Sequence, residues 1–535
     1  MNMPLPSEAL DSLRFDNRFT ALLPADDKLD NSRRQVYGAC YSRVRPTPVA
    51  APRLLAHSRE VAAELGLDEE SCATPLFTEV FVGNRLLPGM DPYAMCYGGH
   101  QFGNWAGQLG DGRAINLGEV IARDGRHLTL QLKGAGPTPY SRRADGLAVL
   151  RSSLREFLCS EAMHHLGIPT TRALSLIATG EEVERDMFYD GHPRLEPGAV
   201  VCRVAPSFLR FGNYELPASR GDLDLLRRLV DFTIESDFSE LGPPCPESYQ
   251  RWFMEVCRRT ARLMVEWMRV GFVHGVMNTD NMSILGLTID YGPYGWLEDF
   301  DPGWTPNTTD AQGKRYCYNN QPHIAQWNLA QLANALYPLI GRVEPLQEAV
   351  KEYSELFVDG WNEMMAAKLG FAMARAEEDR LVKELMQLLP RLNIDMTIFF
   401  RNLAELHPAM EPKADGELPP PVAAALYRPE QPDERTRMAM NDWLRRYLHR
   451  SLLVAGADEE RRRRMNAVNP RYVLRNYLAQ MAIERAEEGD VSLIALLLDT
   501  LRRPYDDQPQ RSHLAEKRPE WARHKAGCSM LSCSS

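Results

Sequence analysis

Two oxygen-bearing side chains stand nine residues apart near the middle of the chain. Asn281 ends the segment His-Gly-Val-Met-Asn-Thr-Asp-Asn (274–281), and Asp290 begins an Asp-Tyr-Gly motif. The apolar, partly alternating run 282–289 between them favours two short strands, and a hairpin there would bring both side chains together. An amide oxygen and a carboxylate suit a hard cation such as Mg²⁺, which keeps part of its water shell for phosphate. The pattern therefore predicts a metal–nucleotide site.

Protein kinases build their metal site from the same residue types, an asparagine of the catalytic loop and the aspartate of Asp-Phe-Gly. They also place a catalytic aspartate two residues after the loop histidine. Here that position is Val276, whose side chain accepts no proton. The loop has the metal donors of a kinase without the usual kinase base.

A glycine-rich stretch, residues 98–118, precedes this site in the chain and contains Gly110-Asp-Gly112-Arg113. Glycines let the backbone approach a phosphate closely, and Arg113 supplies positive charge. A predicted strand (127–132) follows and ends in Lys133. A glycine-rich turn followed by a strand lysine is the arrangement that holds ATP phosphates in kinases. A hairpin with an exposed lysine is the simpler alternative.

The helix predicted after residue 147 supplies a partner for that lysine. In kinases a helix glutamate forms an ion pair with the strand lysine and fixes it against the phosphates. Glu156 stands beside apolar residues and is the preferred partner of Lys133, with Glu161 in reserve.

Two arginines follow the next predicted strand, seven residues apart. Arg203 lies at the end of the strand 200–204, and Arg210 lies in the loop after it. Two guanidinium groups that face one cleft can hold a polyphosphate through paired hydrogen bonds. Pairing with surface acids is an equal alternative, and the residues alone leave both open.

The composition limits the class of protein. The chain has 535 residues, 44% of them hydrophobic and 25% charged, as in an ordinary globular protein. A net charge of −10 argues against a nucleic-acid partner. No apolar run reaches the roughly 18 residues of a membrane span, and the N-terminus lacks signal- or transit-peptide features. The ten cysteines show no metal-type spacing, so we expect a reduced, cytoplasmic chain. We also expect the chain to act as a monomer.

The order of predicted elements gives an α+β fold in four parts. Residues 1–85 form an N-terminal extension packed on the core, and 86–215 form a kinase-like N-lobe with the glycine-rich loop. Residues 216–410 form a kinase-like C-lobe with the metal loop. Residues 411–535 form a helical C-terminal extension and a cysteine-containing tail. The prediction is a protein kinase-like two-lobed fold with an extension at each end.

The chain resembles the selenoprotein O family, called YdiU in bacteria, over essentially its whole length. The resemblance is carried by Gly-Gly-His-Gln-Phe-Gly (98–103), Gly-Asp-Gly-Arg (110–113), Gln-Leu-Lys-Gly-Ala-Gly-Pro-Thr-Pro-Tyr-Ser-Arg (131–142), Asp-Gly (145–146), Arg-Val-Ala-Pro-Ser-Phe-Leu-Arg-Phe-Gly (203–212), the segment 274–282 and Ile-Asp-Tyr-Gly-Pro (289–293). It implies a pseudokinase that moves AMP from ATP to Ser, Thr or Tyr hydroxyls of protein substrates. Some members are described as using UTP. The implied ATP is flipped, so that its α-phosphate faces the acceptor.

The resemblance also implies a role for each matching residue. Asp280 would accept the proton of the acceptor hydroxyl, which answers the absence of a base at Val276. Asn281 and Asp290 would bind Mg²⁺ or Mn²⁺, and Glu156 would pair with Lys133. The implied nucleotide contacts are Gly110, Gly112, Arg113, Lys133, Asp145, Gly146 and Asp290, with Arg203 and Arg210 on the distal phosphates.

The cysteines near the C-terminus suggest a redox function. Many family members end in cysteine or selenocysteine followed by two serines, and here the ending is Cys533-Ser-Ser. Cys317 stands beside basic residues in the loop after Asp290, and thiols near Lys and Arg tend toward a lower pKa. We expect a reversible disulfide between Cys317 and either Cys528 or Cys533 that holds this loop over the site. Three ordinary free thiols are the alternative.

Two other functions compete with nucleotidyl transfer. A catalytically inactive pseudokinase scaffold would explain Val276 equally well, but a scaffold has no need of Lys133, Glu156, Asn281 and Asp290 together. An ordinary protein kinase is weakened by the missing base.

Overall fold

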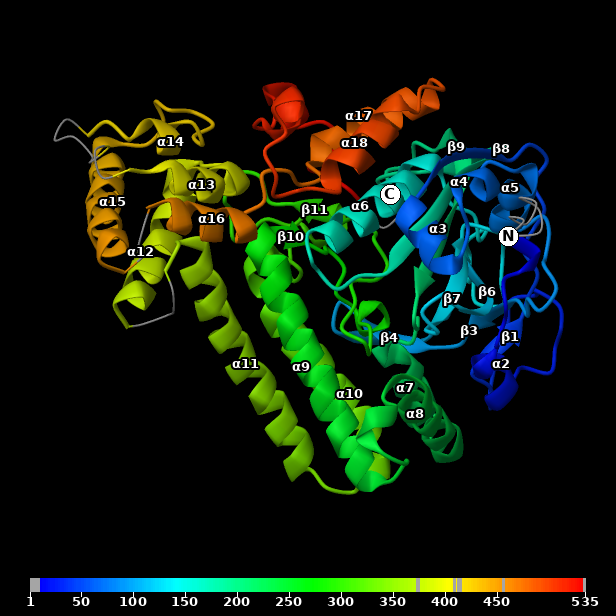
Figure 1. Cartoon of the computed structure of the whole chain (residues 1–535). Helices are drawn as coiled ribbons and strands as arrows, with labels where there is room; N and C mark the ends of the chain where they lie inside the picture. The colour runs from blue at the N-terminus through cyan, green and yellow to red at the C-terminus, as the bar shows by residue number, and fades with distance from the viewer. Residues whose placement is uncertain (1–9, 372–375, 408–409, 411–415, 455–457, 533–535) are drawn as a thin grey trace, which may run out of the picture.

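The computed structural model describes residues 10–371, 376–407, 410, 416–454 and 458–532. A mainly antiparallel sheet with its covering helices forms one lobe, and long helices form the other (Figure 1). This is the α+β, two-lobed kinase-like arrangement that the sequence predicts. Among the described residues, no helix is both long and apolar enough to cross a membrane.

The sheet of the first lobe has seven strands, and every neighbouring pair is antiparallel. In spatial order they are β1 (Tyr41–Arg43), β3 (Tyr93–Met95), β6 (Ala114–Ile121), β7 (His127–Lys133), β9 (Arg194–Ala205), β8 (Arg172–Arg185) and β2 (Arg53–His57). Both edge strands come from the N-terminal extension. Residues 1–85 therefore complete the sheet as well as covering it with short helices, which are α2 (Arg18–Leu22), α3 (Arg59–Leu65), α4 (Glu69–Cys72) and α5 (Pro75–Val82).

Strand β7 and helix α6 (Leu150–His165) place the lysine and the glutamate. The leucines of β7 are fully buried in the sheet core, which fixes the strand and the Lys133 at its end. Every residue of α6 from Leu150 to Met163 is buried. A helix buried on all sides must pair its charged side chains with other buried groups.

The second lobe is organised around α9 (Pro246–Val270), and the helical spacing of apolar residues at 249–270 predicts this helix. Proline at its first turn and Gly271 after its end, at φ 77°, are the usual start and stop signals. Two long helices, α10 (Gln321–Ile340) and α11 (Glu344–Lys368), pack on α9 (Figure 1). The short pair β10 (Phe272–Val273) and β11 (Gly295–Trp296) closes the segment that carries the metal loop.

Residues 282–289 do not form the predicted hairpin. Ser283 bridges to Arg210, and Thr288 bridges to Thr170. Gly286, at φ 67°, makes the turn between them. The run is short, and apart from the turn bond between Gly286 and Ser283 its backbone bonds to neighbouring segments, so no strand pair forms within it. The turn still returns the chain to Asp290.

The remaining helices complete the C-lobe and the C-terminal extension. They are α7 (Phe211–Ser219), α8 (Leu223–Asp237), α12 (Ala376–Leu392), α13 (Met396–Asn402), α14 (Pro420–Ala423), α15 (Glu434–Val454), α16 (Asp458–Val468), α17 (Asn476–Glu487) and α18 (Ser492–Leu501). Helices α17 and α18 return to the first lobe and pack on α6. The tail packs as well, since Cys528 and Leu531 are buried.

Candidate active site

The predicted site residues surround one pocket of about 680 Å³ between the two lobes. That volume is in the range of pockets that hold a nucleotide-sized ligand. The predicted residues that line it are Gly110, Gly112, Arg113, Lys133, Asp145, Gly146, Arg203, Asp280, Asn281 and Asp290. Strands β6 and β7 supply its upper wall, and the segment 274–293 supplies its floor. Two predicted residues, Glu156 and Arg210, lie behind this wall and do not line the pocket.

Lys133 forms a buried ion pair with Glu156, as predicted, and Glu156 is the helix partner that the sequence favours. The other carboxylate oxygen of Glu156 accepts a hydrogen bond from Arg203 at 3.1 Å. The reserve candidate, Glu161, is bound to Arg172 instead, at 2.8 and 2.7 Å. The alternative of an exposed lysine is excluded, because Lys133 is buried.

Arg203 and Arg210 converge on Asp290. Nη1 of Arg203 donates to Oδ1 of Asp290 at 2.5 Å, and Arg210 forms an ion pair with Oδ2. Both arginine residues are only 1% exposed. Burial alone would raise the pKa of Asp290, but Arg210, Arg203 and Lys133 outweigh it and hold that pKa well below its ordinary value. The carboxylate is therefore ionised.

Both arginines pair with Asp290, a carboxylate of the site, and among the described residues neither binds a surface acid. Arg210 also donates to the backbone oxygen of Asp280 at 3.0 Å, so it ties the two aspartates of the site together. Although Arg210 follows its strand in a loop, its burial makes it part of the packing.

Asp290 occupies an unusual backbone conformation, with φ 55°. A non-glycine residue in the left-handed region is uncommon, and such residues gather at functional sites. The turn at Gly286 and the two arginines hold it there. Strain at this position is compensated by the ion pairs that the same carboxylate makes.

Asp280 lies on the pocket floor and is 8% exposed. Its Oδ2 accepts a hydrogen bond from Nε2 of Gln101 at 3.2 Å, whereas its Oδ1 is buried and has no hydrogen-bond partner in the part of the chain that the structure describes. Burial raises the pKa of this carboxyl to about 7. A carboxyl group with these surroundings is suited to accept a proton near neutral pH.

Asn281 and Asp290 have the donor atoms that Mg²⁺ or Mn²⁺ would require. Nδ2 of Asn281 donates to the backbone oxygen of Val276 at 2.9 Å, which leaves the amide oxygen as the free donor atom. A carboxylate has about four lone-pair sites, so the two arginines do not exhaust Asp290. Both side chains line one pocket, and oxygen donors suit these ions. The residues present fit the implied metal.

The rim of the pocket is built by glycines that have no room for a side chain. A Cβ atom at Gly110 would lie 2.5 Å from the ring of Tyr140, and one at Gly112 would lie 2.9 Å from its backbone oxygen. Gly146 has φ 78°, and a Cβ atom there would lie 2.3 Å from the backbone of Gly136. Asp145 beside it binds Arg185 at 2.7 and 2.8 Å. These contacts keep the backbone close to the pocket.

Two residues of the site had no predicted role. Asp111 is buried between Gly110 and Gly112 and accepts hydrogen bonds from the backbone of Met95 and from Asn116, at 2.9 and 3.3 Å. The second is Gln101, which donates a hydrogen bond to Asp280. Both residues stand in motifs that carry the family resemblance, and this was the sequence feature that could have indicated a role for them. The contact between Gln101 and Asp280 joins segments that are distant in the sequence.

The cysteines do not have the environment that the sequence suggested. The expected lowering of the Cys317 pKa is wrong, because burial raises it and outweighs nearby Lys314. Burial raises the pKa of Cys528 to about 11. Both thiols are free in the structure. Cys533 lies outside the described residues.

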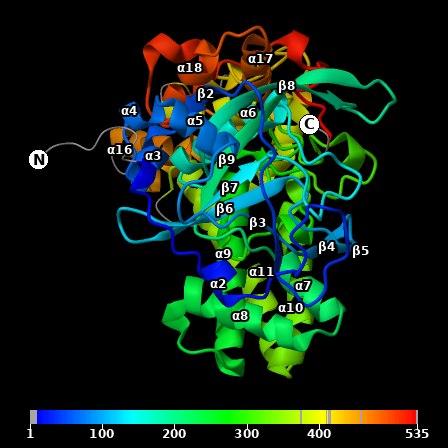
Figure 2. The ribbon, with the colours of Figure 1, turned by 90° about the vertical axis from the view of Figure 1, so that its right-hand side faces the viewer.

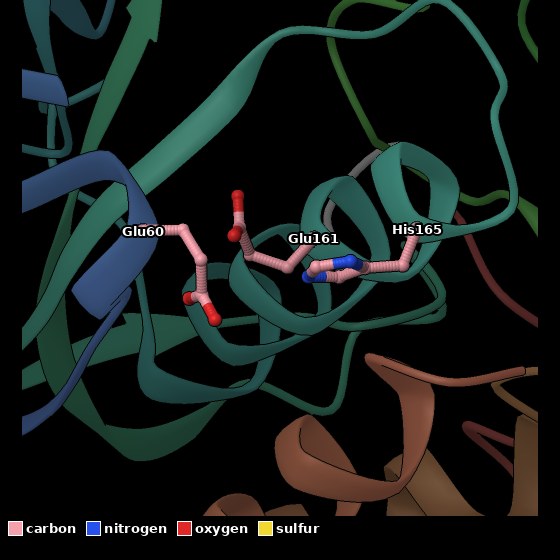
Figure 3. A group of neighbouring side chains, drawn as sticks. All are labelled: Glu60, Glu161 and His165. Atoms are coloured by element: carbon pink, nitrogen blue, oxygen red, sulfur yellow. The ribbon is translucent and has the colours of Figure 1, made fainter. Parts of the chain in front are cut away.

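A second group of potential metal ligands, Glu60, Glu161 and His165, lies away from the pocket (Figure 3). Its carboxylates are already bound by cations. Glu161 is held by Arg172, and Glu60 binds Arg502 at 2.8 Å. Two guanidinium groups beside these acids replace the charge that a metal would supply, so we interpret the group as an ion-pair network between α3, α6 and α18.

Comparison with known proteins gives consistent matches. The model of the family described as "Protein adenylyltransferase SelO" matches residues 30–502. A protein of Aromatoleum aromaticum named "Protein nucleotidyltransferase YdiU" is 62% identical over 531 residues, which covers 98% of this chain and 100% of the relative. A protein of the same name from Rhodopirellula baltica is 61% identical, with 98% and 99% covered. ROP2 from Toxoplasma gondii, a solved protein with a kinase fold, is 12% identical with a TM-score of 0.24, too distant to inform the function.

Proposed function

Because this chain belongs to the SelO family of protein adenylyltransferases, we propose that it moves AMP from ATP to Ser, Thr or Tyr hydroxyls of protein substrates in the pocket described above. The observation that carries the site assignment is Asp280. It is a buried carboxyl on the pocket floor, next to Asn281. It stands four residues after Val276, the position that the catalytic aspartate occupies in kinases.

The triphosphate would lie against the cationic wall of the pocket. Lys133, Arg113 and Arg203 all line it, and each carries a positive charge toward the space between the lobes. We propose that Lys133 binds phosphate, with Glu156 holding it in place. Arg203 and Arg210 would reach the distal phosphates directly or act through Asp290, which they bind in this structure.

The transfer step follows from these positions. The acceptor oxygen attacks the α-phosphorus of ATP, and the bond from that phosphorus to the bridging oxygen of the β-phosphate breaks. The hydroxyl proton passes to Asp280, and pyrophosphate leaves. Asn281 and Asp290 would hold Mg²⁺ or Mn²⁺, which supplies charge neutralisation for the phosphates when bound. Lys133 offsets the negative charge that develops on the departing group.

Mass spectrometry of an acceptor protein tests this function. After incubation with ATP and the divalent metal, we expect peptides with an AMP adduct on a hydroxyl side chain. A phosphate adduct would show a kinase, and unmodified acceptor would show a scaffold. The same assay with UTP tests the proposal that UMP is a second transferred group.

Lys133→Ala is expected to raise the KM for ATP about 10- to 100-fold, because a charge-assisted hydrogen bond to phosphate contributes about 1.5–3 kcal/mol. Glu156 keeps its bond to Arg203, so the variant leaves no buried carboxylate unpaired and should remain folded. Steady-state kinetics and a thermal melt check this, with the exposed Lys351→Ala as control. A parent-like KM together with a collapsed melting temperature would make Lys133 a structural residue.

The tail supports a proposal of redox control. Leu531 bonds to the backbone of Pro306 and Thr308 at 2.9 and 2.8 Å, so the tail docks on the loop that carries Cys317. We propose that an external disulfide oxidant takes two electrons from the thiols of Cys317 and a tail cysteine and joins them in a disulfide, which lowers activity until an external thiol reduces it. Non-reducing mass spectrometry should find the cross-linked peptide, and Cys317→Ser should abolish the response to reductant. An unchanged response in that variant would contradict the proposal.

A further inference from the structure

The hairpin of β4 (Gly98–Gln101) and β5 (Asn104–Gln108) has no part in the mechanism above. It stands apart from the seven-stranded sheet and lies beside α7 and α10 (Figure 2). Its first strand packs against the loop that carries Asp280. A separate element in contact with the proposed base needs an explanation.

Alternate residues of β4 face the base, as strand geometry requires. Gly99 lies so close that a Cβ atom there would be 2.6 Å from Oδ1 of Asp280. Gln101, two residues on, donates from Nε2 to Oδ2 of the same carboxylate at 3.2 Å. One strand therefore encloses one oxygen of Asp280 and binds the other.

The hairpin is also fixed to the residues that precede the base. The backbone N–H of His100 donates to Oγ1 of Thr279 at 2.7 Å, and Thr279 donates to buried Glu215 at 2.7 Å. The backbone N–H of Phe102 donates to Oδ1 of Asn278 at 3.2 Å. These bonds fix the position of the hairpin relative to the loop, so they also fix the position of the Gln101 amide relative to the carboxylate of Asp280.

The turn of the hairpin is held under strain. Phe102 has φ 50°, a conformation that costs a non-glycine residue free energy. Its N–H also donates to the hydroxyl of Tyr316 at 3.0 Å, and the two rings lie 5.2 Å apart. Contacts on both sides keep the turn in this shape, which keeps Gln101 directed at the loop.

We propose that Gln101 is a positioning residue for the transfer reaction, which holds the carboxylate of Asp280 so that Oδ2 takes the acceptor proton. Oδ1 is enclosed against Gly99 and has no hydrogen-bond partner among the described residues, so Oδ2 is the oxygen left for the reaction. The amide of Gln101 occupies one lone pair of Oδ2 and fixes the rotation of the carboxylate. Gln101 lines the same pocket, and its side-chain amide donates to Asp280. This inference rests on the proposed role of Asp280.

The test is Gln101→Met, which keeps the length of the side chain and removes its donor. We expect kcat to fall about 10- to 100-fold, since a small misplacement of a reacting group costs up to about 10²-fold. The affinity for ATP with the divalent metal should stay at the parent value. Asn104→Ala is the matched control, because among the described residues that exposed side chain on the same hairpin bonds only to the backbone of Phe102.

A second arm separates positioning from general damage. In the Asp280→Ala background, Gln101→Met should cause no further loss, because a residue that acts through Asp280 has nothing left to position. Gly99→Ala should reproduce the kcat loss by displacing the carboxylate. A parent-like kcat for Gln101→Met, or an additional loss in the Asp280→Ala background, would overturn the inference. A parent-like rate for Asp280→Ala alone would instead refute the proposed base.

Discussion

Asp290→Ala is expected to abolish both metal-dependent nucleotide binding and AMP transfer. The substitution removes one of the two proposed metal donors and the only carboxylate that Arg210 pairs with among the described residues. A buried guanidinium without its carboxylate destabilises a fold by about 3–5 kcal/mol. Arg203 is less affected, because it keeps Glu156. Calorimetric titration with ATP and Mg²⁺, well below the melting temperature, measures the binding loss.

Asp290→Asn separates the metal function from the ion pairs. It retains the shape of the side chain and one oxygen for hydrogen bonding, so the loss of stability should be smaller than for alanine. Metal-dependent binding should still be lost, because the negative charge is gone. Tight metal-dependent ATP binding by a folded Asp290→Asn protein would show that the metal site lies elsewhere.

Asp280→Ala is expected to bind nucleotide like the parent and to transfer AMP about 10²- to 10⁴-fold more slowly, the usual effect of losing a general base. The side chain lies on the pocket floor and forms no ion pair among the described residues. Its removal opens space beside Gly99 without leaving a charge unpaired. Single-turnover transfer at saturating ATP measures the chemical step directly.

Asp280→Asn is the matched variant, since it keeps the size of the side chain and an oxygen that can accept from Gln101. Its rate should fall as far as that of alanine, because an amide takes no proton. Transfer at the parent rate by either variant would remove Asp280 from the mechanism.

The elements that position the site could be predicted because their signals are local. The spacing of apolar residues predicts α9, and the alternation in β7 places Lys133 at a strand end. The apolar residues beside Glu156 in the sequence favour it over Glu161 as the partner of Lys133. Each of these inferences needs only a short window of sequence and a known arrangement of lysine, glutamate and metal loop.

The parts that could not be predicted depend on contacts between distant segments. The sequence leaves phosphate and surface acids open as partners of Arg203 and Arg210, and it does not indicate their pairing with Asp290, about 80 to 90 residues away in the chain. Basic neighbours suggested a reactive Cys317, whereas tertiary burial raises its pKa. The contact of Gln101 with Asp280 spans 179 residues. A local sequence pattern does not specify which buried side chains contact each other in the folded protein.

The central claim is that this pocket transfers the nucleotidyl group and not the terminal phosphate. Incubation of an acceptor protein with ATP labelled separately at the α- and γ-phosphate tests it most directly, with Asp280→Ala run in parallel. The account predicts acceptor labelling from α-labelled ATP only, with release of the γ-label in pyrophosphate and loss of labelling in the variant. Acceptor labelling from the γ-position would contradict it.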